Sequence, residues 1–214
     1  MASMRSYGQY CALAKALDVI GDRWTLLIVR ELLIRGACRY TDLRDGLPGI
    51  ATNLLVERLR ELEEAGVIGR EEAPPPVATA LFRLTERGEA LEIVLRELGR
   101  WGAPLLANAP KTDAFRGHWL ALPAGEWLRD HAPEQPAILI ELRAGDQSAV
   151  VEAAEGTVRI RAGGTAHPDA VISGTPQLLL GLLAGKIDLA QARHAGVSYK
   201  GDPAVLGRVR PMAV

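Results

Sequence analysis

The sequence predicts an α+β protein built from two domains. Apolar residues recur at helical spacing over most of residues 1–104, where two short extended runs flank three consecutive prolines. Beyond residue 118 the pattern changes to alternating extended runs bounded by turn residues. Residues 105–117 lose periodicity and collect Gly, Pro, Asn and Asp, as an interdomain connection does. We therefore expect a first domain over 1–104, a linker over 105–117 and a second domain over 118–214.

The composition indicates an ordinary globular protein. The chain has 214 residues, of which 48% are hydrophobic and 24% charged, and these values exclude a disordered tail or a fibrous repeat. The formal net charge is −1. Residues 23–60 nevertheless hold seven arginines against four acidic residues, a net +3, whereas residues 61–72 hold five glutamates against one arginine, a net −4. A basic segment inside a neutral protein is compatible with phosphate contact.

Four helices are predicted before residue 66. Leu13, Leu17 and Ile20 form one stripe of an amphipathic helix that ends at Gly21. The next run, Trp24–Ile34, is almost wholly apolar, so we expect it to be the central helix of a small bundle. The third and fourth helices are expected from Thr41 through Leu47 and, after a turn at Pro48-Gly49, from about Ala51 to Ala65.

The helix expected over 51–65 has two different faces. Leu55, Leu59 and Leu62 lie at i, i+4 and i+7 and form the buried face. Asn, Thr and Arg side chains on the other face suit a DNA major groove, because they pair with adenine, thymine and guanine edges or with phosphate. Any solvated surface helix shows the same pattern, so DNA contact does not follow from this helix alone. The residues of the outer face are Thr52, Asn53, Val56, Glu57 and Arg60.

A β-hairpin and a fifth helix complete the first domain. The runs Val67–Arg70 and Leu81–Leu84 are predicted strands, joined by a stiff loop with the sequence EEAPPPVATA. Thr85 is expected to cap the following helix. One face of this helix is too apolar to be left in water and needs a partner surface. That face consists of Leu91, Val94, Leu95, Leu98 and Trp101.

Three helices, a turn, a helix and a hairpin follow the order of a winged helix-turn-helix. Cys11 followed by ALDVIGDRWTLLIVREL, then RYTDLRDGLPGI, NLLVERLRELEEAG and LTERG, resembles the HxlR family of bacterial winged-helix transcriptional regulators over roughly residues 7–103. The resemblance implies a homodimer that binds double-stranded operator DNA as an inverted repeat. The helix from Ala51 would enter the major groove, and the hairpin would lie over the adjacent backbone.

The resemblance also implies roles for individual residues. Thr52, Asn53 and Val56 would face bases, and Arg58 and Arg60 would contact phosphates or base edges. The preceding helix would fix the register on phosphates through Arg39, Tyr40, Thr41 and Arg44. Arg70 and Arg83 would flank the wing, whose acidic and apolar tip departs from a DNA-contacting wing, so we expect only its base to contribute. The dimer interface would hold Leu13, Leu91, Val94, Leu95, Leu98 and Trp101.

The two cysteines, Cys11 and Cys38, are too few for a disulfide framework, so we expect a reducing, cytoplasmic location. Cys11 occupies the position at which redox-sensing members of the family hold a reactive thiol. The alternative, a small buried hydrophobe near the dimer interface, is favoured because no basic side chain adjoins Cys11 and Lys15 is one turn away. Cys38 is expected to be exposed or half-buried beside Arg39.

The second domain is predicted to contain a helix around Trp119–His131, then an antiparallel meander. Extended runs are expected in AILIELRAG, SAVVEAAEG, TVRIRAGG and DAVISG, and three strands joined by short Gly-containing turns form the meander. Two helices are expected after Thr175-Pro176 and from Asp188, and a last strand precedes a helix that begins at Asp202-Pro203.

Residues 169–209, DAVISGTPQLLLGLLAGKIDLAQARHAGVSYKGDPAVLGRV, resemble the end of sterol-carrier-protein-like domains. The resemblance implies a small five-stranded sheet with helices on one face and an apolar tunnel, which a small apolar effector would fill. The alternative is that the same side chains fill a packed core, which is the more frequent state of such leucines. The candidates are Ile138, Ile140, Val150, Leu179 and Leu183.

No pattern of catalytic residues is present. The four histidines and the serines lie in no metal-ligand or nucleophile motif, so we expect neither an enzyme, a cofactor nor a metal site. The apolar runs are too short to span a membrane, and no membrane partner is expected. The sequence thus favours a DNA-binding regulator, and the alternative is a lipid or acyl carrier whose N-terminal half mediates protein contacts.

Overall fold

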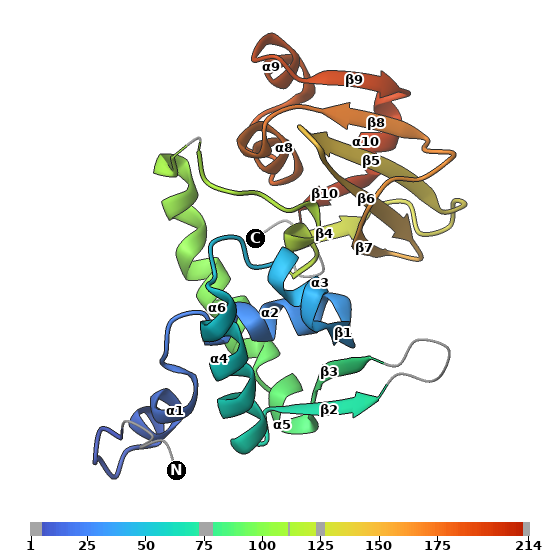
Figure 1. Ribbon diagram of the computed structural model, residues 1–214. Coiled ribbons are helices and arrows are strands. Elements are labelled where there is room, and N and C mark those ends of the chain that lie inside the picture. The colour runs from blue at the N-terminus through green and yellow to red at the C-terminus, as the bar shows by residue number, and fades with distance from the viewer. Residues whose placement is uncertain (1–5, 73–78, 111, 123–126, 212–214) are drawn as a thin grey trace. The chain divides into compact units, whose positions relative to one another are not determined.

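The computed structural model describes residues 6–72, 79–110, 112–122 and 127–211 (Figure 1). It separates into two compact units, Met1–Leu98 and Gly99–Val214. Both contain helices and sheets, so the predicted α+β class is confirmed. Among the described residues, no helix combines the length and the apolar character that a membrane span requires.

The first unit has the elements of a winged helix-turn-helix. Helices α3 and α4 form the helix-turn-helix, and strands β2 and β3 form the hairpin wing, which β1 extends to a sheet with the order β1-β3-β2. The elements are α1 (Ala12–Ile20), α2 (Thr25–Arg35), β1 (Cys38–Arg39), α3 (Tyr40–Asp45), α4 (Thr52–Glu64), β2 (Ile68–Glu72), β3 (Ala80–Leu84), α5 (Glu86–Glu89) and α6 (Glu92–Gly102).

The core of this unit is built around α2. Ile28 and Val29 are fully buried, as the apolar run Trp24–Ile34 predicts for a central helix. Leu55, Leu59 and Leu62 are the buried residues of α4, which confirms the predicted i, i+4, i+7 face.

The helix predicted from Thr85 is divided into two. The Thr85 hydroxyl accepts a hydrogen bond from the backbone N–H of Gly88 and caps the short helix α5, as predicted. The helix ends at Glu89, and α6 begins only at Glu92. Gly88 is packed against the backbone carbonyl of Val67, where a Cβ would clash, so α5 is tied to the start of the wing.

The second unit is built on a five-stranded sheet with the order β7-β6-β5-β8-β9. Strands β5, β6 and β7 form the predicted antiparallel meander, whereas β8 pairs parallel with β5. The elements are η1 (Ala103–Asn108), η2 (Gly117–Leu120), β4 (Leu128–Asp130), β5 (Ile138–Ala144), β6 (Gln147–Ala154), β7 (Thr157–Ala162), β8 (Ala170–Ser173), α8 (Pro176–Leu183), α9 (Leu189–His194), β9 (Ser198–Gly201), α10 (Pro203–Arg208) and β10 (Val209–Pro211).

The helix predicted over Trp119–His131 is wrong at its C-terminal end. Residues Leu128–Asp130 form strand β4, which pairs antiparallel with β10. The partner strand lies about eighty residues further along the chain, as the pairing of Asp130 with Val209 shows. A three-residue strand is too short to carry an alternating pattern, so local sequence gives little sign of it.

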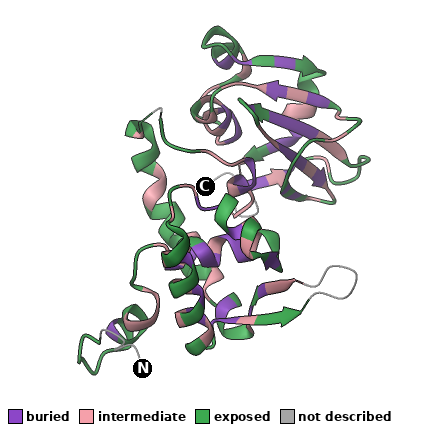
Figure 2. Cartoon of the chain, viewed as in Figure 1, coloured by how far each residue is buried: buried purple, intermediate pink, exposed green. Residues whose placement is uncertain are grey.

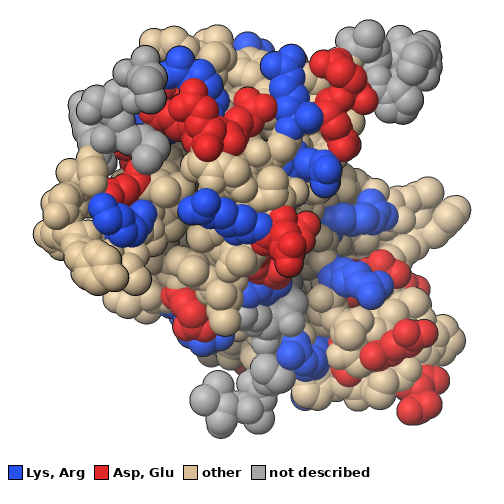
Figure 3. All heavy atoms as spheres, turned by 90° about the horizontal axis from the view of Figure 1, so that it is seen from below, with Lys and Arg blue, Asp and Glu red and all other residues tan. Residues whose placement is uncertain are grey.

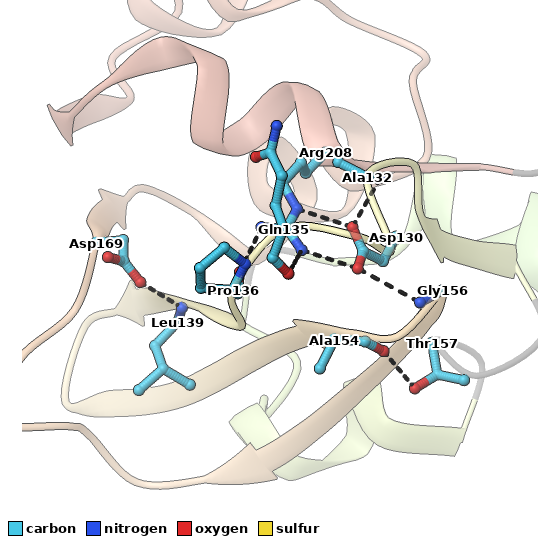
Figure 4. A network of polar contacts seen from close by, with 10 residues as sticks. All are labelled: Asp130, Ala132, Gln135, Pro136, Leu139, Ala154, Gly156, Thr157, Asp169 and Arg208. Atoms are coloured by element: carbon cyan, nitrogen blue, oxygen red, sulfur yellow. Dashed lines mark hydrogen bonds and ion pairs between the residues drawn. The ribbon is translucent and has the colours of Figure 1, made fainter.

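A buried ion pair ties β4 to α10 (Figure 4). The guanidinium of Arg208 donates to both carboxylate oxygens of Asp130, over 2.8 and 2.9 Å, and a third bond of 2.7 Å reaches the carbonyl of Pro136. The Arg208 hydrogen bonds hold the pKa of Asp130 down to about 2. The backbone N–H groups of Ala132 and Gly156 also donate to Asp130, so this carboxylate links β4 both to the residues that follow it and to the turn before β7.

Candidate nucleic-acid interface

The outer face of α4 is exposed along its length. Thr52, Asn53 and Arg60 are exposed, and the Val56 side chain is 54% exposed although it is apolar. Together with Glu57, which is also exposed, these four residues are the outer face of α4. None of them contributes to the core, which the leucines on the opposite side of the helix supply. The structure therefore brings four of the predicted base- or phosphate-contacting residues together on one surface.

The buried Glu31 on α2 supports the connection between α3 and α4. Its carboxylate binds Arg30 at 2.8 Å and Arg35 at 3.0 Å, and Arg30 also donates to the carbonyl of Gly46, between α3 and α4. Burial lowers the pKa of the Arg30 guanidinium, and the charge of Glu31 opposes this shift. This cluster, which the sequence analysis did not identify, fixes the connection that precedes α4.

Helix α3 offers the predicted phosphate-contacting side chains. Arg39, Thr41 and Arg44 are exposed, and Tyr40 is half-buried. The Tyr40 hydroxyl donates to the backbone carbonyl of Thr52 over 3.1 Å, so Tyr40 links α3 to the first turn of α4. Its role is therefore partly structural, whereas the other three side chains point into solvent.

Arg58 does not belong to the outer face of α4. At 100° per residue it lies about 160° around the helix from Arg60. Its Nη1 donates to Asp22 over 2.9 Å and also to Glu61, and its side chain is only 13% exposed. The guanidinium is held against the α1–α2 connection, on the side of α4 away from Arg60, and the expected DNA contact of Arg58 stays a prediction.

The two arginines of the wing lie on opposite faces of the hairpin. Arg70 pairs with Phe82 across the strands and lies over its ring, whereas Arg83 pairs with Gly69 on the other face and binds Glu71 at 3.0 Å. The tip over residues 73–78 lies outside the described residues. Figure 3 shows basic and acidic side chains interspersed over the face that it views, with no single basic patch.

Arg60 is paired only loosely. Its Nε lies 3.7 Å from Glu64, and both side chains are more than half exposed. Exposed i, i+4 pairs of this kind contribute about 0.3–0.5 kcal/mol, so a phosphate competes with Glu64 for Arg60 at little cost. Arg60 therefore remains the basic side chain of the outer face that is available to DNA.

Comparison with known proteins identifies the family. The model of the HxlR-like helix-turn-helix family matches residues 19–109. The uncharacterized HTH-type transcriptional regulator YvaP of Bacillus subtilis is 38% identical over 87 residues, which are 41% of this chain and 80% of YvaP. The chain belongs to the HxlR-like helix-turn-helix family.

Other relatives of this HxlR-like chain match the same region. The HTH-type transcriptional regulator YodB of Bacillus subtilis is 34% identical over 86 residues, 40% of this chain and 76% of YodB. A solved structure of reduced YodB is 29% identical and covers 48% of this chain and 100% of that chain, with a TM-score of 0.41. The family match stops at residue 109, so the resemblance of residues 169–209 to sterol-carrier-protein-like domains stays a prediction.

The residues predicted for the dimer interface of this HxlR-like chain are mostly exposed. Helix α6 is largely exposed in Figure 2, and Leu98 and Trp101 are 50% and 75% exposed. Leu13 on α1 and Val94 on α6 are also exposed. Leu91 is half-buried, and Leu95 is buried within its own chain and fixes α6 in place.

The two cysteines have opposite environments. Cys11 is exposed at the start of α1, and Cys38 is only 3% exposed in β1, which corrects the expected half-exposure. Burial raises the pKa of the Cys38 thiol to about 11. At neutral pH the Cys38 thiol therefore keeps its proton.

The five residues predicted to line an apolar site do not share one surface. Ile140 pairs with Val151, and both lie in the core with Leu179 and Leu183; half-buried Ile138 packs against that core. Val150 pairs with Glu141 and lies on the other face of the sheet, because side chains alternate along a strand. A hollow of about 30 Å³ is lined by Leu120, Trp127, Leu128, Ile160, Leu180, Leu183 and Ala184. This volume suits about one water molecule.

Proposed function

We propose that this chain is a transcriptional regulator that binds operator DNA as a homodimer, with α4 in the major groove. Membership of the HxlR-like family supports the regulatory role. The observation that carries the proposal is the outer face of α4, where Asn53 and Val56 remain exposed beside Thr52 and Arg60. Asn reads adenine through two hydrogen bonds, and Val offers an apolar contact to a thymine methyl.

Phosphate contacts on either side of α4 would fix its register. Arg39, Thr41 and Arg44 of α3 are exposed, and Arg60 exchanges its weak partner readily. We expect the wing to contribute through its base, where Arg70 lies over the Phe82 ring and Arg83 binds Glu71. These contacts carry affinity, and the outer face of α4 carries sequence preference.

A homodimer would present two copies of α4 to successive major grooves. Half-sites one helical turn apart require a separation of about 34 Å between the two helices. The exposed apolar side chains of α1 and α6, including Leu13, Leu98 and Trp101, support a second copy of this chain as the partner. An operator with inverted-repeat symmetry follows from a twofold dimer.

The test is fluorescence anisotropy with labelled duplex DNA from upstream of the chain's own gene, at several salt concentrations. For the wild-type protein, the logarithm of the association constant is expected to fall linearly with the logarithm of the salt concentration, with a negative slope of several units. Asn53→Ala should lose about 1–3 kcal/mol of preference for the specific site over a scrambled duplex.

Asn108→Ala is the matched control, since Asn108 is an exposed asparagine at the end of η1, outside the proposed surface. It should bind as the wild type does. Equal losses in the two variants, or salt-independent binding, would contradict the assignment of α4. Lipid that co-purifies with a protein unable to bind DNA would instead favour the alternative carrier function.

Thiol chemistry at Cys11 is the modulation that we propose, because Cys11 is exposed whereas Cys38 is buried and protonated. Solved structures of the relative YodB include a diamide-treated and a quinone-bound form. Diamide should take up the two thiol hydrogens as it joins Cys11 to Cys11 of a second copy of the chain. This disulfide should reduce the DNA affinity of the wild type and of Cys38→Ser, but not that of Cys11→Ser. An apolar effector in the second unit would need more space than the 30 Å³ hollow provides.

A further inference from the structure

The connection between α1 and α2 contacts the helix-turn-helix at two points. Asp22 of this connection binds Arg58 on α4 over 2.9 Å, across 36 residues of sequence. The ring of Trp24 lies beside Gly49, where a Cβ would be 3.9 Å from the ring. One contact therefore reaches the middle of α4, and the other reaches the connection just before it.

The backbone of this connection is constrained. Trp24 has a φ of 81°, in the left-handed region that a bulky side chain rarely adopts. Such a conformation persists only where surrounding contacts enforce it. The ring contact with Gly49 and the neighbouring Asp22–Arg58 ion pair are contacts of this kind.

Arg58 is committed to this arrangement. Glu61, one turn further along α4, also binds Nη1 of Arg58 and holds the guanidinium on the Asp22 side of the helix. Within the described part of the chain, Nε of Arg58 is a buried donor that lacks an acceptor. This side chain has lost most of its water and cannot reach the outer face of α4 without breaking both ion pairs.

We propose that Arg58 is a positioning residue for DNA binding: through Asp22 it fixes the orientation of α4 relative to the end of α1. Asp22 lies two residues after Ile20, the last residue of α1. A displacement of α1 is therefore transmitted directly to the outer face of α4. The inference rests on the proposed function of α4, but it concerns how α4 is held and not which bases it contacts.

The decisive variant is Asp22→Asn. A positioning role of Arg58 and a phosphate-contacting role predict opposite changes in operator affinity for this variant. If Arg58 positions α4, loss of the ion pair weakens operator binding by about fivefold. If Arg58 contacts phosphate, removing a competing carboxylate releases it, and binding becomes tighter. Arg58→Ala should weaken binding to a similar extent with an unchanged salt slope, whereas loss of a phosphate contact lowers that slope by about 0.9.

A double-mutant cycle tests whether the two residues act as a unit. Asp22→Asn combined with Arg58→Ala should bind no more weakly than either single variant. Glu57→Gln is the matched control, since Glu57 is an exposed acid on the same helix. The Glu57→Gln variant should bind DNA slightly more tightly, because it removes a negative charge that the DNA phosphates repel. Tighter binding by Asp22→Asn, or a reduced slope for Arg58→Ala, would overturn the proposal.

Hydrogen exchange of the DNA-free protein separates this inference from the proposed function. In Asp22→Asn the backbone amides of the first two turns of α4 should exchange about fivefold faster than in the wild type, while those of β5 and β6 remain unchanged. Faster exchange in a protein that binds no DNA would retain the ion-pair role and reject the DNA-binding function. Unchanged exchange in α4 would reject the positioning role.

Discussion

The carboxylate of Glu31 occupies the space that a side chain at Gly46 would need. A Cβ on Gly46 would lie 2.5 Å from Cδ of Glu31, and Glu31 is fully buried between Arg30 and Arg35. Gly46 has a φ of −76°, which any residue adopts. Glycine is required here for its small volume and not for its backbone freedom.

Gly46→Ala is therefore expected to destabilise the first unit. The methyl group forces the buried carboxylate away from its two arginines, at a cost of about 2 kcal/mol in the free energy of unfolding. Urea denaturation followed by circular dichroism measures it. Gly99→Ala is the control, since a Cβ at Gly99 in α6 meets no described atom within 4 Å. It should be neutral or stabilising by up to ~1 kcal/mol, and equal losses in both variants would contradict the steric explanation.

Alkylation should distinguish the two thiols. Iodoacetamide at pH 8 is expected to modify exposed Cys11 rapidly, whereas Cys38 stays unmodified because burial both shields it and raises its pKa to about 11. Mass spectrometry of peptides after timed quenching gives the two rates. In 6 M urea the rates should converge. Fast native labelling of Cys38 would show that β1 opens readily.

Leu98→Glu is expected to shift a homodimer toward monomer, because it places a charge in the proposed interface on α6. Leu98 is half exposed in the single chain, so the substitution should leave the fold of the monomer intact. Size-exclusion chromatography with light scattering gives the mass. Leu27→Glu, on a leucine of α2 that is similarly exposed, should keep the wild-type mass. An unchanged mass for Leu98→Glu would place the interface elsewhere.

The Asp130–Arg208 pair should make the second unit sensitive to acid. The folded-state pKa of Asp130 is lowered from 3.8 to about 2, so its stabilisation is fully present above about pH 4 and is lost as the pH falls toward 2. Thermal unfolding between pH 6 and pH 2 monitors this loss.

Asp130→Asn is the matching variant. It should be less stable by about 3 kcal/mol at pH 6, because Arg208 is left buried without its charge partner. Its unfolding temperature should also fall less steeply between pH 4 and pH 2. A wild-type-like slope in the variant would assign the acid sensitivity to other carboxylates.

The spacing of apolar residues predicted those features of the fold that depend on contacts within one helix. The leucines of α4 and the apolar run of α2 were sufficient to place both helices and their buried faces, because helical periodicity is contained in a few turns. Arg58 shows a contact that residue spacing does not predict. Its partner Asp22 lies 36 residues away, and no spacing within α4 distinguishes an arginine held by a distant acid from one free to bind phosphate.

The misplacement of Val150 has a different origin. Gly145-Asp146 is a two-residue hairpin loop between Ala144 and Gln147, and this loop alone sets Ile140 opposite Val151 and Val150 opposite Glu141. The register was thus recoverable from the sequence once the turn length was counted. Strand β4 was not, because its partner β10 is remote and both strands have only three residues.

The Asp130–Arg208 contact joins residues 78 positions apart, so it also sets an order of events during synthesis. A ribosome adds roughly 5–20 residues per second. Arg208 is therefore synthesised several seconds after Asp130, and the ion pair cannot form before then. Meanwhile the meander of β5, β6 and β7 is complete, but β8, which pairs with β5, and β9, which pairs with β8, are not. The nascent second unit thus exposes the unpaired edge of β5 until β8 has been made, and an unpaired strand edge favours pairing with other chains during that interval.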